Sequence, residues 1–135
     1  MSALVAVVVR TLVLAGLSWL TYWVVDLGMS EEEAGANIGG GLLILAVVIV
    51  VSSVWALLDT MSTGAWLRTA LVWLAVGVLV GVLAALQSQD FSADLDRDVL
   101  ISDLTSLTPF IAGLVVVPAA LGGLLGRILW ESRTR

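Results

Sequence analysis

Long uncharged stretches alternate with short charged segments along this chain. The uncharged stretches occupy residues 11–25, 34–58, 69–89 and 104–126. An α-helix needs about 20 apolar residues to cross the roughly 30 Å hydrocarbon core of a bilayer. The last three stretches reach that length alone, and the first reaches it when its helix starts near Ala3 and includes Arg10. The alternation typical of membrane-spanning strands is absent, so each stretch predicts a helix.

The expected fold is an all-α integral membrane protein with a single transmembrane domain over residues 1–135. Its four predicted spans lie near 3–25, 37–58, 65–87 and 107–130. Between the last two spans, the outer segment 88–106 carries a rough apolar stripe and predicts a short amphipathic helix near 92–104. Pro109 suits the first turn of the last span, whereas Pro118 falls mid-span, where its missing N–H predicts a kink.

The two halves of the chain share a faint pattern. Arg10-Thr11 and Arg68-Thr69 each open a half, and Trp55 and Trp130 each close its returning helix. Two hairpins related by a parallel repeat would produce this pattern. Chance similarity is the alternative, because a chain built from few residue types matches itself easily. Trp73 lies deeper in its span and is expected to pack against a neighbouring helix.

Composition excludes a water-soluble monomer. Hydrophobic residues make up 60% and charged residues 13% of the chain, and the mean hydropathy is +1.10. Soluble domains carry about 25% charged residues, which keep their surface hydrated. The chain has no cysteine and no histidine. This excludes disulfides, thiolate or imidazole metal sites, and Cys/His or Ser/His/Asp catalysis.

The distribution of arginines predicts the orientation in the membrane. An even number of spans places both termini on one side. Five of the six basic residues lie on that side, at Arg10, Arg68, Arg127, Arg133 and Arg135, and only Arg97 lies opposite. The positive-inside rule therefore places both termini in the cytoplasm or, for a viral membrane, in the interior.

The balance of charged residues bears on the source of the chain. Lysine is absent, and acidic residues outnumber basic ones 11 to 6. An acidic outer face stays hydrated where salt screens its repulsion. This favours a salt-loving archaeal host or a virus of one, in a cell membrane or a viral membrane. A GC-rich bacterium is the alternative, since codon bias also removes lysine.

Pairs of glycines four residues apart mark candidate helix-packing interfaces. They are Gly35 and Gly39, Gly77 and Gly81, and Gly122 and Gly126. Glycine lets two helices approach closely, so that dispersion and weak Cα–H···O contacts hold them. We expect these glycines to pack helices within the chain. Contact with other chains and a specific recognition role are the alternatives.

Arg10 is the one charge within a predicted span, which makes it a candidate functional residue. We expect it to extend its guanidinium toward the nearby interface. Pairing with Asp59, Glu131 or a partner's acid, and binding of an ion or lipid phosphate, are the alternatives. Asp94, Asp96 and Asp98 have the spacing that begins a calcium loop, but Val99 and Thr105 replace its glycine and glutamate, so these aspartates predict a solvated acidic face.

No arrangement of residues typical of an enzyme remains, and no cofactor, metal or nucleic-acid partner is expected. The first functional hypothesis is a non-enzymatic structural or accessory subunit. It would pack laterally with copies of itself or with a larger membrane complex, among membrane lipids. The alternative is a pore-forming or transport component, such as a channel subunit or a holin-like protein. It predicts a polar path lined by Thr11, Ser18, Thr21, Asn37, Ser52 and Ser53.

Overall fold

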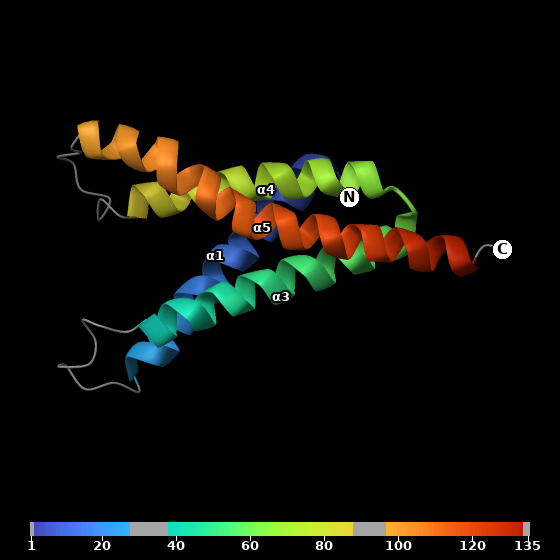
Figure 1. Ribbon diagram of the computed structural model, residues 1–135, viewed down its shortest axis with the longest axis horizontal. Helices are drawn as coiled ribbons and strands as arrows, with labels where there is room; N and C mark the ends of the chain where they lie inside the picture. The colour runs from blue at the N-terminus through green and yellow to red at the C-terminus, as the bar shows by residue number, and fades with distance from the viewer. Residues whose placement is uncertain (1, 28–37, 88–96, 134–135) are drawn as a thin grey trace.

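The computed structural model describes residues 2–27, 38–87 and 97–133, and this part of the chain folds into four long helices (Figure 1). They are α1 (Ala3–Leu27), α3 (Ile38–Thr63), α4 (Trp66–Gln87) and α5 (Arg97–Arg133). All four are long and apolar enough to cross a membrane. The prediction of an all-α, multi-pass membrane protein with four spans is confirmed.

The helices are apolar on their outer faces as well as their inner ones. Leu4, Leu12 and Trp19 on α1 expose 66–75% of their surface, and Leu67 on α4 exposes 65%. A lipid environment accepts such surfaces, but it offers no hydrogen bonds to a bare backbone. Helices satisfy their backbone internally, which explains why these sequences form no other regular structure in the described part of the chain.

The long helix α5 lies between α3 and α4 and packs closely along both (Figure 1). Gly122 faces Ser53 and Gly126 faces Leu57, so α5 runs parallel to α3. The contacts with α4 run in the opposite direction, because Gly77 faces Ala112 and Gly81 faces Thr108, so α5 is antiparallel to α4. Helix α5 therefore packs against α3 and α4 at once and holds these two helices together.

Glycine is required at these contacts because backbone meets backbone. A Cβ atom at Gly81 would lie 2.6 Å from the carbonyl oxygen of Thr108, and one at Gly126 would lie 2.5 Å from that of Leu57. At Gly122 the carbonyl of Ser53 leaves even less room. Lipid tails are as apolar as the side chains, so close van der Waals packing of this kind is what holds the helices together.

A tight turn joins α3 to α4. Gly64 adopts a left-handed conformation (φ 67°), and its N–H donates a 2.8 Å hydrogen bond to the carbonyl of Thr60. This bond ends α3 in the manner common for a glycine that follows a helix. The ring of Trp130 lies 3.0 Å from where a Cβ of Gly64 would stand, so both the backbone and the space favour glycine.

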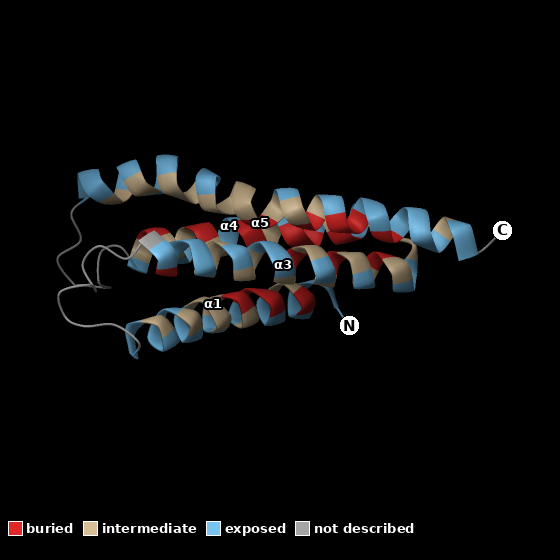
Figure 2. Cartoon of the chain, turned by 60° about the horizontal axis from the view of Figure 1, so that its bottom comes forward, coloured by how far each residue is buried: buried red, intermediate tan, exposed pale blue. Residues whose placement is uncertain are grey.

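The bundle is tightly packed at one end and loosely packed at the other. We call the end that carries Asp59, Gly64 and Trp130 the narrow end, and the end that carries Tyr22 and Gln87 the wide end. Helices α3 and α4 converge at the narrow end and diverge toward the wide end (Figure 1). In Figure 2 the buried parts of α1 and α5 lie in the halves nearer the narrow end. These include Ala6–Leu14 of α1 and Val115–Gly126 of α5.

Two expectations about the last helix are wrong. Residues 97–104 form no separate amphipathic helix, because α5 continues from Arg97 to Arg133, and Pro109 lies well inside it. A proline removes only one backbone hydrogen bond, and the packing of Thr108 on Gly81 holds α5 in place at this point. Residues 92–96 lie outside the described part.

Pro118 also lies inside α5, which stays helical on both sides of it. Figure 1 shows that α5 is bent rather than straight, as internal prolines predict. A kink localised at Pro118 stays a prediction, as does the repeat relating the two halves.

Candidate functional site

Arg10 points into the bundle rather than toward the membrane surface. It shares the inward face of α1 with Ala6 and Leu14, which are four residues away on either side. Only 5% of Arg10 is exposed. The expectation that this side chain reaches for the interface is therefore wrong, and one of its alternatives, a pairing with Asp59, is what the structure contains.

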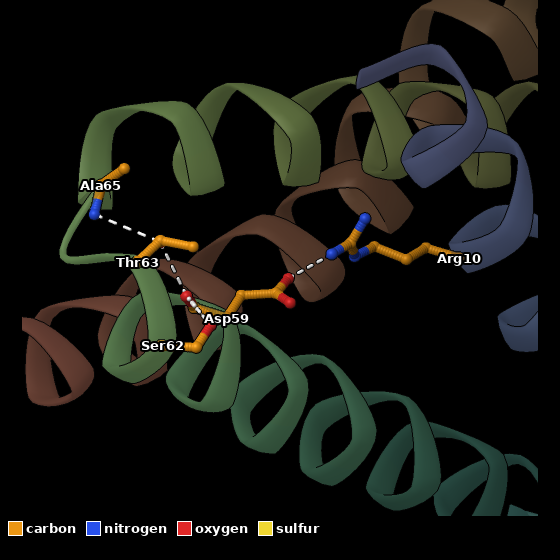
Figure 3. A network of polar contacts seen from close by, with 5 residues as sticks. All are labelled: Arg10, Asp59, Ser62, Thr63 and Ala65. Atoms are coloured by element: carbon orange, nitrogen blue, oxygen red, sulfur yellow. Dashed lines mark hydrogen bonds and ion pairs between the residues drawn. The ribbon is translucent and has the colours of Figure 1, made fainter. Parts of the chain in front are cut away.

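Arg10 and Asp59 form an ion pair between α1 and α3 (Figure 3). The guanidinium Nη2 donates to the carboxylate Oδ2. The arginine side chain is 7% exposed and the aspartate side chain 28% exposed, so the pair lies mostly inside the protein. Charges inside a membrane segment are costly unless they are paired, and this pairing fixes the position of α1 against the end of α3.

The end of α3 holds Asp59 in place. The hydroxyls of Ser62 and Thr63 donate hydrogen bonds of 2.9 and 2.8 Å to the backbone carbonyl of Asp59 (Figure 3). The hydroxyl of Thr63 also accepts a 3.3 Å bond from the N–H of Ala65, at the start of the next helix. The carboxylate therefore projects from a last helical turn that is tied to the turn between α3 and α4.

Two tryptophans enclose the guanidinium. The Arg10 Cζ lies 5.3 Å from the ring centre of Trp55 on α3 and 5.8 Å from that of Trp73 on α4. The two rings meet edge to face, with centres 6.2 Å apart and planes at 75°. Both distances lie within the range of cation–π attraction, which is strongest for tryptophan and for desolvated cations. The expected packing of Trp73 against a neighbouring helix is thus present in its contact with Trp55, and Arg10 brings a third helix, α1, into the same cluster.

Buried hydrogen-bond donors remain unused around this pair. Within the described part of the chain, Arg10 Nε and Nη1 and the Trp73 Nε1 are buried and have no hydrogen-bond partner, and the Thr11 hydroxyl is in the same situation. A guanidinium has five N–H groups, so a single carboxylate leaves much of its capacity unmet. The indole faces compensate part of this cost. The cluster can therefore lock helices together, and we see in it no group placed for covalent chemistry.

A cavity of about 660 Å³ lies at the wide end of the bundle. All four helices contribute walls: α1 between Ala15 and Tyr22, α3 between Gly41 and Val48, α4 between Val80 and Gln87, and α5 between Phe110 and Val115. The cavity and the ion pair are separated along the bundle by an apolar layer. Leu14, Val76 and Val115 in this layer are fully buried, at 0% exposed.

Among the described residues, the polar side chains predicted to line a pore lie in different parts of the bundle. The Ser52 and Ser53 hydroxyls donate to the carbonyls of Val48 and Ile49 in their own helix, and Thr21 does the same with Leu17. Ser18 lines the cavity, and Thr11 lies beyond the apolar layer. Asn37 lies outside the described residues. Hydroxyls that bond their own backbone satisfy themselves in lipid and need no water.

The candidate packing glycines divide into two groups. Gly77, Gly81, Gly122 and Gly126 are buried in contacts within the chain. Gly39 is exposed, and Gly35 lies outside the described residues. Asp94 and Asp96 also lie outside the described residues. Asp98 lies in the first turn of α5.

The tryptophan enclosure of Arg10 was not predicted, although the sequence carries a signal for it. Trp55 and Asp59 are four residues apart, which places them on the same face of a helix. An arginine that pairs with this aspartate therefore passes the ring of Trp55. Trp73 comes from another helix, so no spacing in the sequence around Arg10 or Asp59 predicts its contact with the guanidinium.

No family of known proteins, no curated protein and no solved structure matches this chain. What the protein does must therefore be inferred from its own geometry. Three features are available for this purpose: the ion pair with its tryptophans at the narrow end, the cavity at the wide end, and residues 97–106 of α5, none of which is buried.

Proposed function

We propose that this chain is a non-enzymatic integral membrane subunit that docks laterally, through the uncovered start of α5, with a second copy or a larger membrane complex. The observation that carries the proposal is the state of residues 97–106. They form regular helix, yet none of them is buried. Helices of this kind usually gain their stability by covering an apolar face.

The start of α5 projects past its neighbours. At about 1.5 Å per residue, the 37 residues of α5 reach roughly 55 Å, against about 30 Å for the hydrocarbon core. Figure 1 shows α5 extending beyond the adjacent ends of α3 and α4. Val99 and Ile101 in this projection expose 47% and 49% of their surface. A partner that covers Ile101 gains more apolar contact than the described residues of this chain supply.

The glycine contacts narrow the choice of docking surface. Gly77, Gly81, Gly122 and Gly126 already hold α3, α4 and α5 together. They are therefore not free to form an interface with another chain. A lateral partner must use another surface. We propose the start of α5, because it extends beyond the adjacent ends of α3 and α4 and carries exposed apolar side chains.

The proposal includes the orientation inferred from the arginines. Both termini lie in the cytoplasm of a cell or the interior of a viral particle, and the wide end faces outward. In this orientation the start of α5 meets its partner at the outer membrane surface. Labelling of single cysteines with a membrane-impermeant reagent in intact cells or particles tests this placement.

Cross-linking in native membranes tests the docking proposal directly. The chain contains no cysteine, so single cysteines can be introduced without background. Ile101→Cys places a thiol on the exposed apolar side of α5. Ser106→Cys places one about 140° around the same helix, as the matched control.

With a thiol-reactive cross-linker, we expect Ile101→Cys to give a discrete product of higher mass, several-fold above that of Ser106→Cys. Equal products from both variants would indicate random collision, and monomer alone from both would remove the basis of the proposal. Flux of ions or small solutes through vesicles containing the pure protein separates this function from the pore alternative. Selective leakage would contradict the docking role.

A further inference from the structure

We infer that the cavity at the wide end is a binding site for the hydrocarbon chain of a membrane lipid. This inference goes beyond the docking proposed for α5 and does not depend on it. It rests on the depth of the cavity, on the chemistry of its walls and on the apolar layer that closes it.

The cavity is deep and ends inside the bundle. Seven residues separate Ala15 from Tyr22 on α1, and seven separate Val80 from Gln87 on α4. At about 1.5 Å per residue, the cavity extends roughly 10 Å along these helices, about a third of the hydrocarbon core. Val115 closes it from α5, and it is completely buried.

The walls are apolar and the polar groups gather near the mouth. Among the described residues that line the cavity, none carries a charge. Tyr22 and Gln87 lie toward the wide end, and Ser18 lies one turn deeper than Tyr22. Water needs two to four polar partners to occupy a buried site, and apolar cavities of this kind stay dry. An apolar body with a polar, uncharged group at its outer end matches this distribution.

A lipid chain fits a cavity that ends at this apolar layer better than a helix of another protein does. A partner helix that spans the membrane needs about 20 residues and would have to continue past the layer formed by Leu14, Val76 and Val115. A hydrocarbon chain can end there. The volume of the cavity also suits a small ligand, because about 660 Å³ falls within the range of roughly 300–1,000 Å³ typical of sites for small molecules.

Glycine substitutions offer a matched pair of variants. Gly41 lines the cavity, and a Cβ atom added there would meet nothing within 4 Å. Gly41→Phe therefore adds its Cβ in open space and places a large side chain at the cavity wall. Gly16 on α1 also has nothing within 4 Å of its Cβ position, but it is exposed and lies outside the cavity lining. Gly16→Phe is the control for a bulky side chain added to a helix.

The experiment uses the full chain in vesicles of phosphatidylcholine that contain a small fraction of the same lipid with a diazirine in one chain. After illumination, adducts are mapped by mass spectrometry. In the unaltered chain we expect adducts on Leu83 and Leu114, in the cavity wall, at several times the level on Leu74, which faces out from α4. Gly41→Phe should lower the cavity adducts at least tenfold, and Gly16→Phe should leave them unchanged.

Other results would overturn the inference. Cavity adducts at or below the level on Leu74 would mean that the site holds no lipid chain. Equal loss in Gly41→Phe and Gly16→Phe would trace the effect to helix surface rather than to the cavity. Gly41→Leu, with a smaller side chain, should give an intermediate loss. If cavity adducts stay at the Leu74 level in the unaltered chain and Gly41→Phe abolishes the Ile101→Cys cross-link, the cavity belongs to a protein partner.

Discussion

Removing one partner of the Arg10–Asp59 pair is the most informative perturbation of this bundle. Asp59→Asn keeps the shape of the side chain and removes its charge. The guanidinium then stays enclosed between α1, Trp55 and Trp73 with no anion beside it. The Nε and Nη1 atoms of Arg10 already have no hydrogen-bond partner. The variant therefore increases the free-energy penalty of keeping the guanidinium buried.

The magnitude follows from burial. Breaking a buried ion pair from one side costs about 3–5 kcal/mol, because an uncompensated charge is left in a low dielectric. The Asp59 side chain is 28% exposed, which allows some solvation of the site and favours the lower end of this range. We therefore expect a loss of about 3 kcal/mol, which corresponds to roughly a hundredfold change in the folding equilibrium.

The assay is reversible unfolding in mixed micelles of a mild detergent and sodium dodecyl sulfate, followed by tryptophan fluorescence. Glu131→Gln is the matched control. Glu131 accepts a 2.8 Å hydrogen bond from Arg127 one turn away, and both of these side chains are about half exposed. Exposed pairs of this spacing contribute about 0.3–0.5 kcal/mol, so the control should lose little.

The double variant Arg10→Met, Asp59→Leu tests the reasoning from the other side. It removes both charges, and well-packed apolar replacements of a buried pair are often neutral or stabilising by about 1–4 kcal/mol. We expect it to recover most of the stability lost in Asp59→Asn. An Asp59→Asn variant no less stable than Glu131→Gln, or a double variant as unstable as the single one, would refute the account of this pair.

Three further outcomes follow from the packing. Gly122→Ala should lower stability by about 1–3 kcal/mol in the same unfolding assay, because its methyl group meets the neighbouring backbone. Gly113 has nothing within 4 Å of its Cβ position, so Gly113→Ala should raise stability by up to about 1 kcal/mol through helix propensity. Trp55→Leu should cost about 2 kcal/mol when Arg10 is present and less in an Arg10→Met background, a difference that a double-mutant cycle measures. Pro118→Ala restores a backbone hydrogen bond. If Pro118 bends the helix, the distance between spin labels at the two ends of α5, measured by double electron–electron resonance, should increase in this variant.

The helices themselves were predictable because their cause is local. Each span follows from the length of an uncharged stretch and the thickness of a bilayer, and the observed α4, Trp66–Gln87, agrees closely with the predicted 65–87. Two of the three glycine pairs, Gly77 with Gly81 and Gly122 with Gly126, lie at close helix contacts, and their spacing indicates packing positions for the same kind of reason. A missing side chain at every fourth position produces one smooth stripe on a helix, wherever its partner lies.

The arrangement of the helices was not predictable, because it depends on which stripe meets which. Nothing in the spacing of Gly122 and Gly126 states that they face α3, whereas Gly77 and Gly81 receive α5 from the opposite side. Arg10 illustrates the same limit. A charge near the end of a span has a low-cost route to the interface, and only the arrival of Asp59 from another helix makes the inward position favourable. The prediction that Pro109 lies in the first turn of the last span was wrong for the same reason, because packing against α4 keeps α5 helical on both sides of this residue.

The narrow end and the cavity have a common origin in the way α1 is attached. Helices α3, α4 and α5 meet through glycines, whose backbones can approach closely. The glycine that α1 carries, Gly16, faces open space, so α1 has no such contact. The ion pair and the two tryptophans attach it instead, near its start, and no residue of α1 after Leu14 is buried. A helix fixed by bulky groups at one end stands away from its neighbours at the other, and the space left there is the cavity. Loss of the Arg10–Asp59 pair should therefore loosen one wall of the proposed lipid site as well as the narrow end.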